Sequence, residues 1–108
     1  MAYRLARSPE AIEDIEAIAS YIERDSPWYA RAVVSNIVET SEAIPEHPEL
    51  GRIVPEIGDK LIRERFVYSY WIIYRIESER ILVATVLHGS RLLQPFMARI
   101  EDSQKSNP

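Results

Sequence analysis

Apolar residues recur every three or four positions near the start of the chain, which is the spacing of one buried helical face. The stripe comprises Ala11, Ile12, Ile15, Ile18, Ala19 and Ile22. Ser8 is placed to cap this helix, and Pro9 suits its first position because the N–H that proline lacks would have no helical partner there. The run Asp25-Ser26-Pro27 predicts where the helix ends.

The same Ser-Pro signal opens a second helical pattern, with Ser26 as N-cap and Pro27 at the first position. Its stripe comprises Ala30, Val33, Val34, Ile37, Ser41 and Ile44. Pro45 and Pro48 predict its end, because proline cannot continue a helix. Two helices that each have one apolar face and are joined by a tight turn are typical of an antiparallel helical hairpin.

A period of two replaces helical spacing in the second half of the chain and predicts strands at residues 61–67, 70–77 and 80–88. Two-residue links join them, Tyr68-Ser69 and Ser78-Glu79, so we expect an antiparallel meander. Residues 3–7 predict a further strand that joins this sheet. Residues 45–59 predict an ordered loop with apolar anchors, and the apolar positions in 92–100 are compatible with a short final helix.

The order of these elements predicts an α+β fold of the form β-αα-βββ, with the helical hairpin packed on one face of a curved antiparallel sheet. A chain of 108 residues with 46% hydrophobic content suits a single core. We therefore expect one domain over residues 1–100 and a frayed tail over 101–108. The other face of the sheet is expected to be partly open, so its side chains are candidates for function.

The amino-acid composition limits the kinds of site that the protein can contain and the cellular compartment that it suits. The chain has no cysteine, which excludes disulfides and thiolate metal sites and suits a reducing cytoplasm. No apolar run approaches the roughly 20 residues of a membrane-spanning helix, and the N-terminus lacks the pattern of a secretory signal. With two histidines and three glycines, neither a zinc site nor a phosphate-binding loop is expected. We expect a cytoplasmic protein without metal or cofactor and without membrane association.

Four short motifs follow one another in order: HPELGR at 47–52, LIR at 61–63, YWIIYR at 70–75 and VLHGSR at 86–91. In a chain of this size the ordered set resembles the RelE/ParE toxins of type II toxin–antitoxin systems, and more closely the ParE branch, over roughly residues 3–93. The resemblance implies that a partner antitoxin wraps and silences the toxin in a hetero-oligomer.

The resemblance also implies two alternative activities. ParE-like toxins poison DNA gyrase without hydrolysis of their own, whereas RelE-like toxins are metal-independent endoribonucleases that cut mRNA on the ribosome. The net charge is −4, with −7 in residues 1–59 and +3 in residues 60–108. An acidic chain is poorly suited to a ribosomal site lined with RNA, so we favour a ParE-like gyrase inhibitor with a ParD-like antitoxin. A third alternative is an inactive relative kept as a binding module.

Several side chains are candidates for contact with the target. Arg63 and Arg65 lie two apart on a predicted strand and so share a face. We expect this to be the open face of the sheet, where they could bind phosphate or an acidic surface; a solvated edge strand is the alternative. Of the aromatic residues near one predicted hairpin, Tyr74 suits the core, whereas Tyr70 is more open to a surface role. Arg91 follows the turn at Gly89 and could contact a partner or pair with an acid of the first helix.

His88 ends the last predicted strand and could act as a general acid in RNA cleavage. Such chemistry would need a base, from Glu56 or Glu64, and a cation, from Arg63 or Arg91. We favour a structural role for His88 at the strand end, so the gyrase interpretation assigns no catalytic residue. The ribonuclease alternative would assign Arg63, His88 and Arg91.

Trp28 and Tyr29 stand at the start of the second predicted helix, outside its apolar stripe. An exposed tryptophan at such a place is a typical anchor for a protein partner. We therefore expect the antitoxin to cover part of the helical hairpin there and to lay a segment along the sheet or its edge.

Overall fold

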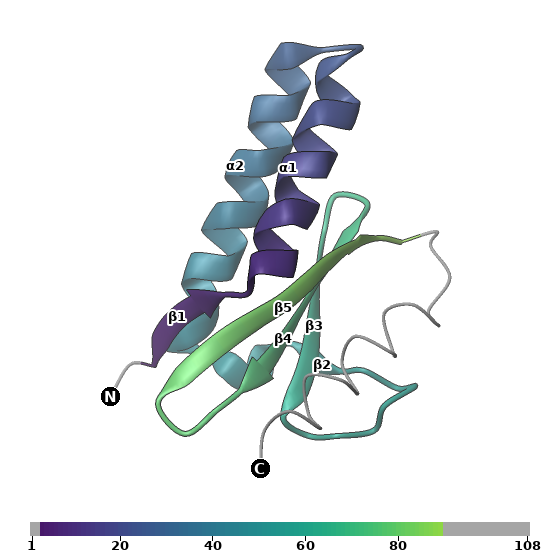
Figure 1. The fold of residues 1–108 in the computed structure, drawn as a ribbon. Helices are drawn as coiled ribbons and strands as arrows, with labels where there is room; N and C mark the ends of the chain where they lie inside the picture. Colours follow the sequence, from purple (N-terminus) through teal and green to yellow (C-terminus); the bar gives the residue numbers. More distant parts are fainter. Residues whose placement is uncertain (1–2, 90–108) are drawn as a thin grey trace.

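The computed structural model describes residues 3–89, which form a helical hairpin packed on one face of a five-stranded sheet (Figure 1). Its helices are α1 (Pro9–Glu23) and α2 (Pro27–Ala43), followed by the short 3₁₀ turns η1 (Ile44–Glu46) and η2 (Pro48–Leu50). Its strands are β1 (Arg4–Arg7), β2 (Arg52–Ile53), β3 (Ile62–Val67), β4 (Tyr70–Ile76) and β5 (Arg80–His88). The expected helix at 92–100, the expected tail and Arg91 lie outside the described residues.

Both helices begin where their Ser-Pro signals predict. The Ser8 hydroxyl accepts a hydrogen bond from the Ala11 amide at 3.0 Å, and the Ser26 hydroxyl accepts one from the Tyr29 amide at 3.1 Å. One expected stripe position is wrong, because Ile12 is 46% exposed. Its neighbour Ala11, also in the stripe, is buried instead, since the two side chains point about 100° apart and only one can face the core.

The sheet order is β1-β5-β4-β3-β2. The meander β3-β4-β5 is antiparallel, as predicted, but β1 pairs with β5 in parallel, from Arg4 opposite Arg80 to Arg7 opposite Val83. The sheet is therefore mixed rather than wholly antiparallel. A parallel pair cannot be joined by a tight turn, and here the helical hairpin and strands β2 to β4 lie between its two strands in the chain. The two-residue β2 lies within the expected loop and is too short to show an alternating pattern.

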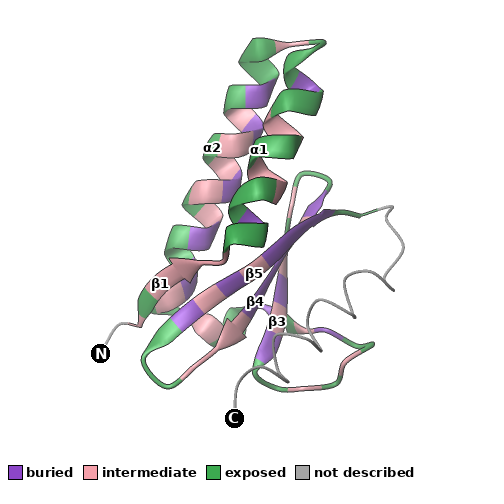
Figure 2. Cartoon of the chain, viewed as in Figure 1, coloured by how far each residue is buried: buried purple, intermediate pink, exposed green. Residues whose placement is uncertain are grey.

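Each face of the sheet carries its own apolar cluster. The larger lies under the helices (Figure 2) and includes Val33, Ile37, Tyr74 and Val83. The smaller lies on the opposite face, where Val54 and its partly buried neighbour Ile57 pack with buried residues of β3, β4 and β5. The face that we expected to be partly open is thus covered at one end by the loop after β2.

Candidate functional site

Arg63 and Arg65 share a face, but it is not the open one. Arg63 stands opposite Tyr74 and Arg65 opposite Ile72, and both partners belong to the cluster under the helices. Residues directly opposite in an antiparallel pair point to the same side of the sheet. The expectation that these arginines lie on the open face is therefore wrong. Alternation along β3 fixed only that they share a face, whereas the packing of the helices decided which face it is.

The guanidinium of Arg63 is held by backbone carbonyls. Its Nη1 donates to the carbonyls of Glu49 and Gly51, each at 3.1 Å, and its Nε donates to the Lys60 carbonyl at 2.9 Å. These bonds tie β3 to the 3₁₀ turn η2. Arg63 thus has a structural role, and its contact with a target stays a prediction.

Tyr74, in the core, forms hydrogen bonds that hold η2 in place. Its hydroxyl donates to the Pro48 carbonyl at 2.5 Å and accepts from the Gly51 amide at 3.1 Å. Burial raises the pKa of the Tyr74 phenol, and the Gly51 hydrogen bond and the charges of Arg65 and Arg63 partly oppose this shift. A Cβ at Gly51 would lie 2.1 Å from the Tyr74 hydroxyl, so only glycine fits. Within HPELGR, Pro48 and Gly51 are accordingly explained by their contacts with Tyr74.

The open end of the opposite face carries an arginine among aromatic rings. Arg52 pairs with the buried Glu64 carboxylate, through Nε at 2.7 Å and also through Nη2. Its guanidinium carbon lies 5.2 Å from the centre of the Trp71 ring. The Trp71 ring in turn lies 4.5 Å, centre to centre, from the ring of the exposed Phe66, with the two rings tilted by 53°. The sequence reasoning missed Arg52 and Phe66. The signal available was the alternation of Ile62, Glu64 and Phe66, which share the face that Arg63 and Arg65 do not occupy.

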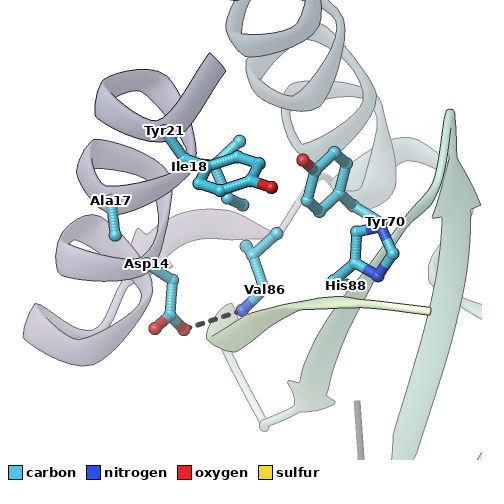
Figure 3. A pocket seen from close by; sticks show the side chains of 7 residues that line it. All are labelled: Asp14, Ala17, Ile18, Tyr21, Tyr70, Val86 and His88. Atoms are coloured by element: carbon cyan, nitrogen blue, oxygen red, sulfur yellow. Dashed lines mark hydrogen bonds between the residues drawn. The ribbon is translucent and has the colours of Figure 1, made fainter. Parts of the chain in front are cut away.

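His88 lies at the rim of a cavity of about 330 Å³ between α1 and the sheet (Figure 3). Its imidazole meets the Tyr70 ring edge to face, with 5.3 Å between ring centres. Tyr70 is only 9% exposed, so it offers a wall of this cavity rather than a projecting side chain. Asp14 closes the floor, where its carboxylate accepts from the Thr85 hydroxyl at 2.6 Å and the Val86 amide at 3.0 Å.

Among residues 3–89, the structure does not bring together the side chains that RNA cleavage was expected to need; Arg91 lies outside this range. His88 lies on β5 opposite Tyr70, whereas Arg63 lies on β3 opposite Tyr74, so β4 runs between the two residues. Ordinary strand spacings put their Cα atoms about 17 Å apart. Glu64 is turned to the other face of the sheet, where Arg52 holds it, and Glu56 is exposed in the loop after β2. Within residues 3–89, His88 thus has neither of these carboxylates nor Arg63 beside it.

Three aromatic side chains are exposed at the start of α2 and at the turn between β3 and β4. Trp28 is 70% exposed, Tyr29 43% and Tyr68 45%. The rings of Tyr29 and Tyr68 meet edge to face at 6.1 Å, and Asn36 donates to the Tyr68 hydroxyl at 3.4 Å. We call Trp28, Tyr29 and Tyr68 the aromatic surface. The expected exposure of Trp28 and Tyr29 is confirmed, and their contact with an antitoxin stays a prediction.

Residues 3–89 contain neither a cluster of metal ligands nor a helix that could span a membrane. No three His, Asp or Glu side chains gather there in a way that could hold a metal ion. Neither α1 nor α2 has the length and apolar character that crossing a bilayer requires. The described side chains leave several aromatic and arginine residues exposed.

Comparison with known families identifies the chain. Residues 5–93 match the model of the ParE toxin of the type II toxin–antitoxin system parDE. The chain belongs to this family. The match spans β1 to β5, so it covers every element described above. No protein with a curated description matched the sequence.

Solved structures share the fold of this ParE-family chain at low sequence identity. A chain of the chromosomal ParDE system from P. aeruginosa has a TM-score of 0.68 and 19% identity, over 81% of this chain and 96% of that one. A chain of the RelBE2 toxin–antitoxin complex from Mycobacterium tuberculosis has a TM-score of 0.59 and 15% identity, over 82% and 99%. A double mutant of the E. coli toxin RelE in the free state has a TM-score of 0.63 and 14% identity, over 100% of both chains.

Proposed function

We propose that this ParE-family toxin inhibits DNA gyrase without catalysing a reaction of its own, and that a ParD-like antitoxin neutralises it in a hetero-oligomer. The observation that carries the proposal is the match to the ParE toxin family over residues 5–93. The similar structures include toxins of both the ParE and the RelE type, so fold alone does not separate the two activities.

Two features favour gyrase over the ribosome. The separation of Arg63 from His88, with Glu64 on the opposite face, means that these three side chains do not form one site for metal-free RNA cleavage. The charge of −7 in residues 1–59 also opposes entry into an RNA-lined site. We keep Arg63, Arg65, Tyr70 and Arg91 as proposed target contacts. Of these, Arg65 gives the clearest test, because a substitution of Arg63 would also remove its hydrogen bond to η2.

Purified full-length toxin added to gyrase, ATP and supercoiled plasmid tests the target. We expect linear, cleaved plasmid to accumulate with the wild-type toxin, and expression in bacteria to cause filamentation and a DNA-damage response. A control reaction with antitoxin added first should show no cleavage. Rapid translation arrest with cut mRNA and intact DNA would instead establish the RelE-like alternative. Normal growth and unaffected gyrase would overturn the toxin proposal and leave a binding module.

A further inference from the structure

Tyr68 has a backbone conformation that tyrosine seldom adopts. Its φ is +54°, and among residues 3–89 it is the one non-glycine residue with a positive φ. This region is disfavoured for residues with a Cβ and readily adopted by glycine. Tyr68 also lies in the two-residue link between β3 and β4, where glycine and asparagine are the usual choices. A large aromatic residue at this position therefore opposes the local preference of the chain.

Contacts within the fold do not account for a tyrosine at position 68. The Tyr68 side chain stays 45% exposed, and its hydrogen bond from Asn36 is long, at 3.4 Å, and exposed. The ring contact with Tyr29 joins two side chains that both face solvent. Strain that the fold does not require is typical of positions used for binding. The ring of Tyr68 is thus better explained by something that it touches outside this chain.

The surroundings of the aromatic surface indicate a protein partner. Two exposed carboxylates and two exposed guanidinium groups stand at this end of the hairpin, those of Glu23, Asp25, Arg24 and Arg31. Their charges cancel, so the site lacks the positive field that phosphate binding relies on. Tryptophan and tyrosine grouped on an exposed surface are the side chains that most often dominate protein–protein affinity. The surface therefore suits a protein segment with apolar side chains.

We propose that Tyr68 binds the antitoxin together with Trp28 and Tyr29, and that its strained conformation is retained for this contact. The inference rests on the proposed function, because it takes the antitoxin as the partner. The strained turn holds the Tyr68 ring against Tyr29 before binding, which lowers the entropy lost when a partner docks. One antitoxin segment then crosses from the start of α2 to the β3–β4 turn and contacts both layers of the fold.

The test uses full-length toxin and a candidate ParD-like antitoxin, which is to be sought as a small open reading frame adjacent to the toxin gene. Affinity is measured by titration calorimetry, and stability by the thermal midpoint of the free toxin. We expect Tyr68→Gly to bind at least tenfold more weakly with a midpoint no lower than wild type, because glycine relieves the turn. Tyr68→Phe should keep the affinity within about twofold, since it retains the ring. Leu50→Ala, an exposed apolar residue beside the Ile76 end of β4, is the control and should bind like wild type.

Wild-type affinity in Tyr68→Gly would overturn the inference while leaving the toxin–antitoxin pair intact. A marked fall in its thermal midpoint would assign Tyr68 to the fold instead. Loss of gyrase inhibition with antitoxin affinity unchanged would make Tyr68 a target contact, which also contradicts the inference. Failure of the wild-type toxin to bind the antitoxin at all would overturn the proposed pairing itself, and the role of Tyr68 with it.

Discussion

At the scale of single residues, Tyr74 connects the core to the HPELGR segment. Its phenol is fully buried and hydrogen-bonds to both Pro48 and Gly51. A buried polar group that loses its partner costs more than the bond contributed, so each member of this set depends on the others. Pro48 and Gly51 of this segment thus have a structural explanation in their hydrogen bonds to Tyr74.

We expect Tyr74→Phe to lower the free energy of unfolding by about 1–3 kcal/mol, because it leaves the Pro48 carbonyl and the Gly51 amide without their partner. Urea denaturation at neutral pH measures this loss. Tyr21→Phe, at a 70% exposed tyrosine, is the matched control and should change stability by less than about 0.5 kcal/mol. Equal stability of Tyr74→Phe and wild type would show that the phenol does not fasten the segment.

The pH dependence of the same variant checks the direction of the Tyr74 pKa. Burial raises that pKa above its ordinary value of 10.0, so the unfolded chain loses the phenol proton first as the pH rises. The stability that Tyr74 contributes is therefore present below pH 10 and is lost as the pH rises through the folded-state pKa. The difference between wild type and Tyr74→Phe should accordingly shrink in alkaline solution, and a constant difference would contradict the assignment.

At the scale of elements, the start of α1 completes the edge of β5. β1 pairs with β5 only as far as Val83, and β5 continues to His88. Beyond that point Ser8 donates from its hydroxyl to the Ala84 carbonyl at 2.8 Å, and Asp14 accepts from the Val86 amide at 3.0 Å. Side chains of a helix thus replace a missing neighbouring strand, which protects an edge that could otherwise pair with another chain.

We expect Asp14→Ala to destabilise the fold by about 1–3 kcal/mol, because it removes the acceptor for both Thr85 and Val86. Amide hydrogen exchange provides a local readout, in which the Val86 amide should exchange faster relative to amides in the middle of β4. Glu13→Ala alters the exposed neighbouring carboxylate and serves as control. If Val86 exchanges at the same rate in both variants, Asp14 does not protect the strand edge.

At the scale of the whole molecule, the two faces of the fold differ in the side chains that they expose. The helix-bearing side carries the aromatic surface and the cavity beside His88. The opposite side carries Arg52 over Trp71, with Phe66 exposed. The two faces thus expose chemically distinct surfaces.

We expect the double substitution Trp28→Ala and Tyr29→Ala to weaken antitoxin binding at least tenfold, because exposed aromatic anchors contribute strongly to affinity. Stability should change little, since both side chains are largely exposed. Leu61→Ala, 52% exposed beside the start of β3, is the control for a loss of exposed apolar surface. Unchanged antitoxin affinity in the double variant would exclude these residues from the interface.

The sequence by itself determined the elements and their order, because caps, stripe spacing and two-residue links act over a few neighbouring residues. Ser8 and Ser26 marked both helix starts correctly, and the links at 68–69 and 78–79 set the meander. The ordered motifs also pointed to the right family.

Only the tertiary structure decided which face each strand residue occupies and which distant residues meet. Alternation shows that Arg63 and Arg65 share a face, but the position of the helices put them under the hairpin. The parallel pairing of β1 with β5 likewise joins segments more than seventy residues apart. Such contacts depend on how layers close around a core, and no local pattern in the chain carries that information. For the same reason, the separation of His88 from Arg63 became apparent only once the strands were in register.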